Sequence, residues 1–277
     1  MGTFWNTYAF YVLYANIDQF DPTKYTLDYD KLSLMDQWVL SKLHSLIQYV
    51  DQNLEKYHII ESARAIQDFL DDVSNWYVRR SRERFWQKDM PQDKINAYMT
   101  LYTVLVETAK VAAPFVPFMT EEIYRNLVKS VDKSAPESIH LCDYPQVHEA
   151  WIDKELEKNM DLVLQIVVQG RACRNTAAIK NRQPMSKMYV KSNFVLPAEF
   201  QELVKDELNV KEVSFTDDVK DFTTYLFKPQ LKTVGPKYGK LLPSIRELLT
   251  TLDGNTAMEQ LRQGESLHFN VQGEEVI

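Results

Sequence analysis

Arginine and aromatic side chains are concentrated in one short segment, residues 76–86. Guanidinium planes and aromatic rings are the two surfaces on which unpaired nucleic-acid bases stack, and arginine also pairs with phosphate. The segment therefore predicts contact with RNA. Two structural roles remain open as alternatives, because aromatic residues can pack in a core and cations stabilise the C-terminal end of a helix. The candidate contacts are Trp76, Arg79, Arg80, Arg82, Arg84 and Trp86.

Two further segments carry local positive charge. Residues 171–191 contain 6 lysines and arginines, residues 228–246 contain 5, and neither segment has an acidic residue. The whole chain has a net charge of −7, so any phosphate contact must come from local patches. A solvated face, or pairing with acidic residues of the same chain, is the alternative. The candidates are Arg171, Arg174, Lys180, Arg182, Lys237 and Lys240.

Residue types that carry out catalysis are present, but not at catalytic spacings. The 5 histidines form no HExxH pattern, and no GxSxG occurs. The adjacent carboxylates Asp71 and Asp72 point about 100° apart on a helix and are predicted to form a solvated acidic face. Cys142 and Cys173 show no CxxC spacing, so neither a disulfide nor a zinc site is indicated. The sequence predicts no catalytic residue, metal site or cofactor in this chain.

The cellular location follows from two other patterns. No signal peptide is visible at the N-terminus, and no apolar run approaches the roughly 18–20 residues that a membrane helix needs. Reduced thiols are typical of the cytoplasm. We therefore expect a cytoplasmic protein.

The first half of the chain shows apolar residues at the spacings of three and four that are typical of helices. Ser33 and Asp36 predict a capping box at the start of the second helix, and Pro91 suits the first turn of the fourth. Thr120 is predicted to cap a fifth. Long helices joined by short breaks predict an antiparallel bundle. The expected helices cover residues 4–17, 33–57, 59–77 and 91–112, and a last one begins after 120.

Beyond residue 135 the pattern becomes mixed, with β-branched and alternating segments between helical ones. Strands are expected at 138–142, 187–191, 210–215 and 224–227, a hairpin at 267–277, and helices at 150–178, 199–208 and 241–252. We therefore predict a mainly α fold, with a helical bundle over 1–148 and a smaller α/β domain over 149–277. Both ends of the sequence suggest a piece of a longer protein, cut within its last hairpin.

Several ordered motifs resemble those of isoleucyl-tRNA synthetases. They are WNTYAFYVLYAN at 5–16, SNWYVRR at 74–80, AIKNRQPMS at 178–186, LNVK at 208–211 and GPKYGK at 235–240. The second is similar to the eukaryote-like branch of that family, which some bacteria also carry. Ala178 stands where the family usually has glycine, and Asn181 where it usually has a small or apolar residue. The resemblance covers nearly the whole chain.

The resemblance implies a class Ia anticodon-binding bundle, followed by a junction domain, that recognises isoleucine tRNA. It implies neither DNA nor a membrane as a partner. The second implied partner is the catalytic domain of the same polypeptide, in a parent ligase that joins isoleucine to its tRNA with ATP and Mg. This chain lacks both class I catalytic signatures, the HIGH-like sequence and the KMSKS loop. It is therefore expected to be inactive alone and to hold no cofactor.

Three alternatives stay open beside this interpretation. One is a helical protein-interaction module without a role in RNA binding. Another is the same region of a valyl-, leucyl- or methionyl-tRNA synthetase, since these share the bundle. The last is a stand-alone enzyme with a site assembled from scattered acids, which no sequence feature supports.

Overall fold

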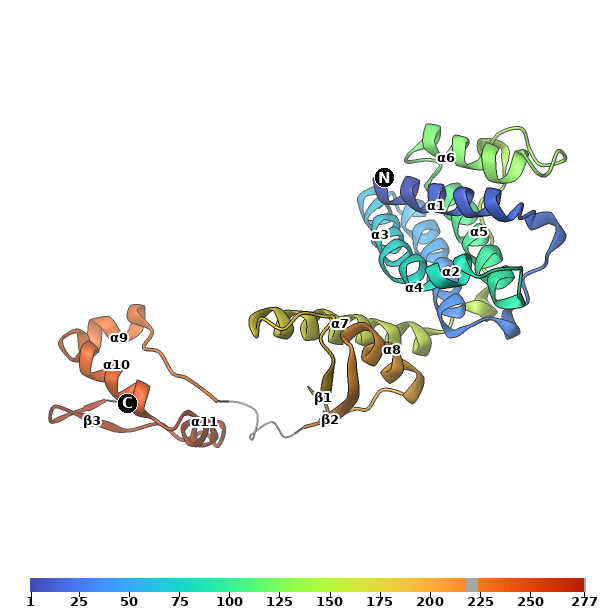
Figure 1. The fold of residues 1–277 in the computed structure, drawn as a ribbon. Coiled ribbons are helices and arrows are strands. Elements are labelled where there is room, and N and C mark those ends of the chain that lie inside the picture. Colours follow the sequence, from blue (N-terminus) through green and yellow to red (C-terminus); the bar gives the residue numbers. More distant parts are fainter. Residues whose placement is uncertain (218–223, 277) are drawn as a thin grey trace. The chain divides into compact units, whose positions relative to one another are not determined.

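The computed structural model describes residues 1–217 and 224–276, and its fold is drawn in Figure 1. Contacts within the chain define two compact units, Met1–Gln165 and Ile166–Ile277. The division lies inside one continuous helix, α7 (Lys154–Thr176). The sequence placed the change of domain earlier, near residue 148, where α7 has not yet begun.

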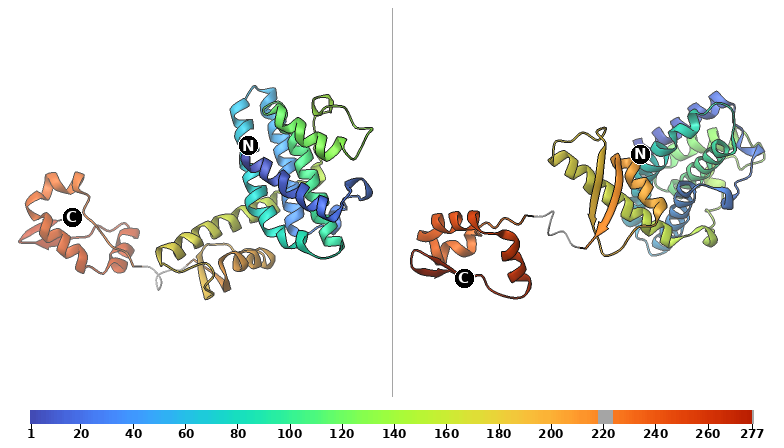
Figure 2. Two further views of the ribbon diagram at one scale, coloured as in Figure 1. Left: turned by 45° about the horizontal axis from the view of Figure 1, so that its top comes forward. Right: turned by 60° about the horizontal axis from the view of Figure 1, so that its bottom comes forward.

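Helices build the first unit almost entirely, and they lie side by side in all the views (Figure 1 and Figure 2). The fold thus confirms the predicted mainly α class and the bundle. Short 3-10 turns lie at Pro22–Lys24, Tyr29–Lys31, Ile139–Leu141 and Glu149–Trp151. The helices are α1 (Gly2–Asp18), α2 (Leu34–Glu55), α3 (Ile59–Asp72), α4 (Arg79–Trp86), α5 (Gln92–Ala112) and α6 (Pro117–Tyr124), with π-helical segments at Val73–Val78 and Arg125–Lys129.

The start of α2 and the core of the bundle follow the sequence pattern. The Ser33 hydroxyl accepts the Asp36 N–H (3.3 Å), and the Asp36 carboxylate accepts the Ser33 N–H (3.2 Å), which confirms the capping box. Trp38, Tyr77 and Tyr98 are among the largest fully buried side chains. Burial of an apolar side chain contributes about 1.5–3 kcal/mol, so packing rather than helix propensity holds the bundle together.

Two predictions in the first unit are wrong for local reasons. Thr120 does not cap a helix, because α6 already begins at Pro117. Its hydroxyl instead donates back to the carbonyls of Val116 and Pro117 (both 3.1 Å). Residues 138–142 form a 3-10 turn instead of a strand, because the Glu121 carboxylate accepts the Ile139 N–H (3.0 Å) that a strand would pair.

The second unit contains the predicted mixture of strands and helices. Strand β1 (Met185–Lys191) pairs in parallel with β2 (Val210–Thr216), in a register that runs from Met185↔Val210 to Lys191↔Thr216. Helix α8 (Ala198–Leu208) connects them and packs against β2. This crossover through a helix is the usual way to join parallel strands.

The last part of the chain is mainly helical and ends in a hairpin. It contains α9 (Leu231–Tyr238), α10 (Leu242–Thr251), α11 (Gly254–Arg262) and the antiparallel strands β3 (Phe269–Val271) and β4 (Glu274–Val276). The strand predicted at 224–227 is wrong. The Tyr225 N–H donates to the side chain of Asn255 on α11 (3.2 Å) rather than to a neighbouring strand.

Candidate nucleic-acid interface

The segment with arginines and aromatic residues completes a continuous helix that begins at Ile59 and passes through the π-helical segment Val73–Val78. Its aromatic rings divide between core and solvent. Tyr77 and Phe85 are buried, and Trp76 is only 9% exposed, so these rings pack inside the bundle. π-helical segments often occur at functional sites, which draws attention to the residues that follow this one.

Exposed side chains follow one another along one side of α4. Arg79, Arg82 and Trp86 lie at spacings of three and four, so they are neighbours on the helix surface. Trp86 is 57% exposed, and its indole N–H donates to the hydroxyl of Tyr14 on α1 (2.6 Å). The Arg79 guanidinium lies 5.5 Å from the centre of the Trp76 ring. We call Tyr14, Arg79, Arg82 and Trp86 the α4 surface; Tyr14 was not predicted from the sequence.

Two arginines of the same segment are not part of this surface. Arg80 is half-buried, and Arg84 is directed into the bundle. The Arg84 guanidinium donates both of its terminal N–H groups to the Asp36 carboxylate (2.8 Å each) and its Nε–H to Asp93 (3.0 Å). Burial acts to lower the pKa of Arg84, but the hydrogen bonds and charge of Asp36 outweigh it and raise the pKa. The guanidinium therefore stays charged and is committed to the interior.

The sequence does contain a signal that separates Arg84 from its neighbours. Arg84 comes seven residues after the buried Tyr77 and three after the buried Ser81, so it continues the inward stripe of the helix. Arg79, Arg82 and Trp86 lie off that stripe. The phase of the core positions, rather than residue type alone, identifies which arginines reach solvent.

Two arginines of the second basic segment are also engaged within the protein. Arg171 pairs with the Glu207 carboxylate, whose side chain is 3% exposed. Arg174 is 4% exposed and lies on the same face of α7 as the buried Met160, Val163 and Val167. It therefore has a structural role. Its guanidinium donates to the carbonyls of Lys180, Gln183, Leu208 and Asn209.

Lys180 and Arg182 are exposed in the loop between α7 and β1. This loop is held from within by Arg174 and by Asn209, whose side-chain amide donates to the Arg182 carbonyl (3.0 Å). Ala178 opens the loop in the left-handed conformation (φ 55), the position where glycine would be unstrained. The two cations thus extend outward from a fixed backbone.

Lys237 and Lys240 are exposed at the end of α9 and in the turn after it. They lie three residues apart above a small core that contains Leu241, Ile245, Val271 and Val276. Neither lysine forms an ion pair with a residue that the structure describes, so both are available to a phosphate group.

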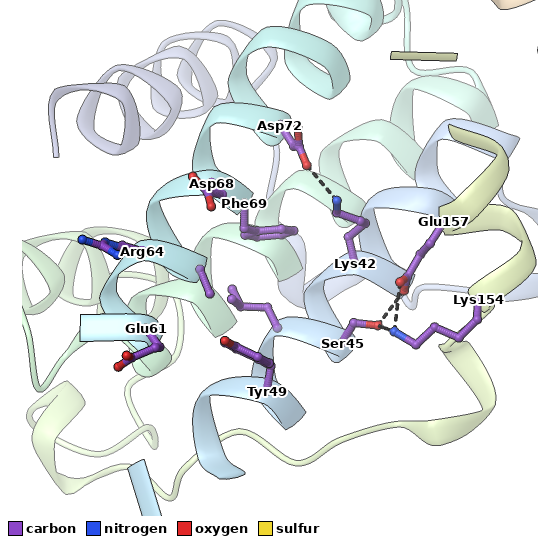
Figure 3. Close-up of a pocket in the computed structure, with 12 residues that line it drawn as sticks. Lys42, Ser45, Tyr49, Glu61, Arg64, Asp68, Phe69, Asp72, Lys154 and Glu157 are labelled. Carbon is purple, nitrogen blue, oxygen red and sulfur yellow. Dashed lines mark hydrogen bonds and ion pairs between the residues drawn. The ribbon is translucent and has the colours of Figure 1, made fainter. Parts of the chain in front are cut away.

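A groove of about 530 Å³ lies between α2 and α3. Figure 3 shows Lys42 pointing toward Asp72, and Glu157 held by Ser45 and Lys154 beside it. The Lys42 ammonium is 2.9 Å from Asp72, and both Ser45 and Lys154 donate to Glu157 (2.6 and 2.9 Å). The groove is therefore lined by ion pairs that fasten α2 to α3 and to the first turn of α7.

The lining of this groove carries four carboxylates and three cations, several of which pair with one another. Burial raises the pKa of Asp72, and the charges of Asp161 and Asp68 add to the rise, while Lys42 opposes it. Asp72 is thus paired and partly buried, so its prediction as part of a solvated acidic face is wrong. Because Lys42 and Lys154 are paired with carboxylates of the groove, the α4 surface is the stronger candidate for RNA.

The described part of the chain, residues 1–217 and 224–276, offers no group of three or more histidine, cysteine, aspartate or glutamate side chains placed to hold a metal ion. Within the same residues, no helix is long and apolar enough to cross a bilayer.

Known proteins match this chain along its whole length. The family model for the anticodon-binding domain of tRNA ligase matches residues 36–190. The chain is 48% identical to an isoleucine–tRNA ligase of Clostridium tetani over 100% of its length, and 42% identical to that of Thermus thermophilus over 98%. It is 41% identical to isoleucine–tRNA ligase 2 of Bacillus cereus over 97% of its length. The chain spans about a quarter of these relatives, 26%, 26% and 25%.

Proposed function

Because the chain belongs to the family of anticodon-binding domains of tRNA ligases, we propose that it is the tRNA-recognition region of an isoleucine–tRNA ligase. Support for isoleucine comes from relatives of that name, which match the chain from end to end at 41–48% identity. The proposed partner is isoleucine tRNA. The ligase reaction, with its ATP and Mg, is assigned to the three quarters of the relatives' length that this chain does not match.

The observation that carries the proposal is the α4 surface. Unpaired bases of an anticodon loop can stack on the exposed Trp86 ring and on the Arg82 guanidinium. Their Watson–Crick edges then remain free for hydrogen bonding. Tyr14 fixes the indole by accepting its N–H, so the ring is presented in one orientation.

The exposed cations of the second unit can bind phosphate, whereas the α4 surface can stack with bases. Lys180, Arg182, Lys237 and Lys240 are proposed to contact phosphates. Such contacts position RNA without reading its sequence. In a whole ligase, the binding energy would orient the distant acceptor end for reaction.

The test is binding of the 277-residue chain to isoleucine tRNA, beside a transcript with an altered anticodon, at two salt concentrations. Base stacking contributes about 1–3 kcal/mol, so Trp86→Ala is expected to weaken native tRNA binding by roughly 5- to 150-fold. Trp5→Ala is the matched control, because Trp5 is also well exposed (42%) but lies near the opposite end of α1 from Tyr14.

Preference for the native anticodon that survives higher salt, and is lost in Trp86→Ala, supports recognition of bases by the α4 surface. Equal binding of both transcripts that falls steeply with salt reduces the function to phosphate contact. No binding of either transcript at low salt contradicts the proposal and favours a protein-interaction module.

A further inference from the structure

Two clusters of buried charge lie directly beneath the end of α4. The first, the Asp36 cluster, consists of Asp36, Tyr77, Arg84 and Asp93. Asp36 is fully buried and accepts two hydrogen bonds from Arg84 and one from the Tyr77 hydroxyl (2.6 Å). These residues come from the start of α2, the π-helical segment, the last turn of α4 and the start of α5.

The second, the Asp18 cluster, consists of Asp18, Lys94 and Tyr98. Lys94 is 1% exposed, and its ammonium lies 2.7 Å from the Asp18 carboxylate at the end of α1. The same ammonium donates to the carbonyl of Gln87 (2.8 Å), the residue that follows Trp86. The Tyr98 hydroxyl also donates to Asp18.

The two clusters hold the chain on both sides of the exposed indole. Arg84 lies two residues before Trp86 and is bound to α2 and α5, whereas Gln87 lies one residue after it and is bound to α5 through Lys94. The hydroxyl of Tyr14 holds the indole itself. The last turn of α4 is therefore fixed to three other helices by directional contacts.

Stability alone does not account for such clusters. Moving charges out of water costs several kcal/mol per ion, and replacing a buried ion pair with apolar groups of similar volume is often neutral or stabilising. Directional hydrogen bonds, in contrast, restrict geometry in a way that apolar contacts do not. The hydrogen bonds of the buried charges therefore restrict the orientation of the last turn of α4, which bears the exposed Trp86.

We propose that Arg84 and Lys94 are positioning residues, which hold Trp86 and Arg82 in the orientation that an unpaired RNA base requires. The proposal rests on the proposed function of the α4 surface. It assigns no RNA contact to Arg84 or Lys94, whose donors are taken up by Asp36, Asp93, Asp18 and Gln87.

The experiment removes the most buried acid and its basic partner together, so that no unpaired charge remains buried; Asp93, whose side chain is 50% exposed, is left in place. One variant combines Asp36→Asn with Arg84→Met, since the amide oxygen of asparagine can still accept the Ser33 N–H while its NH2 group donates to the Tyr77 hydroxyl. A second combines Asp18→Asn with Lys94→Met. The control combines Lys42→Met with Asp72→Asn, an ion pair in the groove of Figure 3, which is not part of either cluster.

Three quantities are measured on the full chain: the urea midpoint of unfolding, the affinity for isoleucine tRNA, and amide hydrogen exchange at residues 82–89. We expect the cluster variants to keep the wild-type midpoint, to lose at least tenfold in affinity, and to exchange at least tenfold faster in that segment. The control pair is expected to change neither affinity nor exchange there. If a double variant fails to fold, Arg84→Lys keeps the charge, loses the two-point contact, and is expected to show the same losses.

Cluster variants that keep both wild-type affinity and wild-type exchange overturn the proposal, as does faster exchange with unchanged affinity. If the wild-type chain does not bind tRNA, the proposed function fails. Amide hydrogen exchange at residues 82–89 still tests whether Arg84 and Lys94 hold the end of α4 in place. Unchanged exchange at residues 82–89 would then overturn the positioning role independently.

Discussion

Arg84 and Arg174 differ from Arg82 and Arg182 in their surroundings, not in their chemistry. Arg84 binds a buried carboxylate, and the Arg174 donors end on backbone carbonyls. Arg82 and Arg182 extend into solvent. Leaving a buried carbonyl unpaired costs about 1–3 kcal/mol, so Arg174 is required by the fold. Arg84 is taken up by its carboxylate partner, whereas Arg82 and Arg182 are available for binding.

Substitution of Arg174 and Arg182 should separate these roles. Arg174→Ala is expected to destabilise the part of the chain around β1 and β2 by about 3 kcal/mol, because the buried Leu208 carbonyl and three partly buried carbonyls lose their donor. Arg182→Ala should leave the urea midpoint unchanged and lower the salt dependence of tRNA binding by about one unit of slope. Equal loss of stability in both variants would contradict this assignment.

His44 provides a prediction about pH. It is 2% exposed, its ring lies 5.1 Å from that of His148, and its Nδ1 accepts the His148 N–H (3.3 Å). Burial, followed by the charge of His148, lowers the pKa of His44 to about 4, from 6.5. Because the folded state disfavours the proton, stability is fully present above pH 6.5 and is lost as the pH falls toward 4.

The expected loss over that window is roughly 3 kcal/mol, measured as the free energy of unfolding in urea at each pH. His44→Phe should remove this part of the pH dependence, while His58→Phe, at an exposed position, should keep it. A wild-type chain and a His44→Phe variant with parallel pH profiles would refute the role of His44.

At the scale of elements, strain is visible where α2 turns into α3. Tyr57 adopts the left-handed conformation (φ 60) although it is 86% exposed and has little to pack against. Its N–H donates to the Leu54 carbonyl (3.0 Å), and the His58 N–H donates to that of Asn53 (2.8 Å). These bonds close the end of α2 in the way that usually employs glycine.

Tyr57→Gly is therefore expected to stabilise the chain by about 1 kcal/mol, since a side chain in this conformation costs roughly 1–2 kcal/mol. Thermal unfolding measures the change. Tyr57→Ala is the control, because it removes the ring but keeps the Cβ atom that causes the strain. A gain of equal size in both variants would assign the effect to the exposed ring instead.

Elements with local causes could be predicted from the sequence, and those with distant causes could not. Apolar spacing located α2 and α5, and the capping box located the start of α2, because these signals lie within the element. The turn at 138–142 depends on Glu121, and the segment near Tyr225 depends on Asn255. Arg84 combines both cases: the helical phase of the buried Tyr77 and Ser81 indicates that it faces inward, whereas its partner Asp36 lies 48 residues earlier and could not be predicted.

At the scale of the whole molecule, the division into two compact units predicts that damage can be confined to one of them. Gly254 begins α11 in close contact with the backbone of Tyr225. A Cβ atom at Gly254 would overlap the Tyr225 carbonyl oxygen, which cannot move without displacing the chain. Gly235 on α9, in contrast, has open space around it.

Gly254→Ala should therefore disrupt packing in residues 224–276, while the unfolding of the first unit stays unchanged. Limited proteolysis followed by mass spectrometry would reveal new cleavage sites near α11 and none in the bundle. Gly235→Ala is the matched control and should resist proteolysis like the wild type. Cleavage of the bundle in Gly254→Ala would show that the two units unfold together.

Because of the π-helical segment Val73–Val78, the long helix is expected to tolerate the deletion of one residue at some positions and not at others. A π-helical turn contains an extra residue relative to an α-helical turn. Loss of one residue inside Val73–Val78 can restore a regular α-helix, and the residues before and after it then still direct the same side chains toward the core. The same loss within α3 or α4 would rotate one flank by about 100° and turn core residues toward water. Single-residue differences in length among related genes should therefore accumulate in this window and be rare on either side of it.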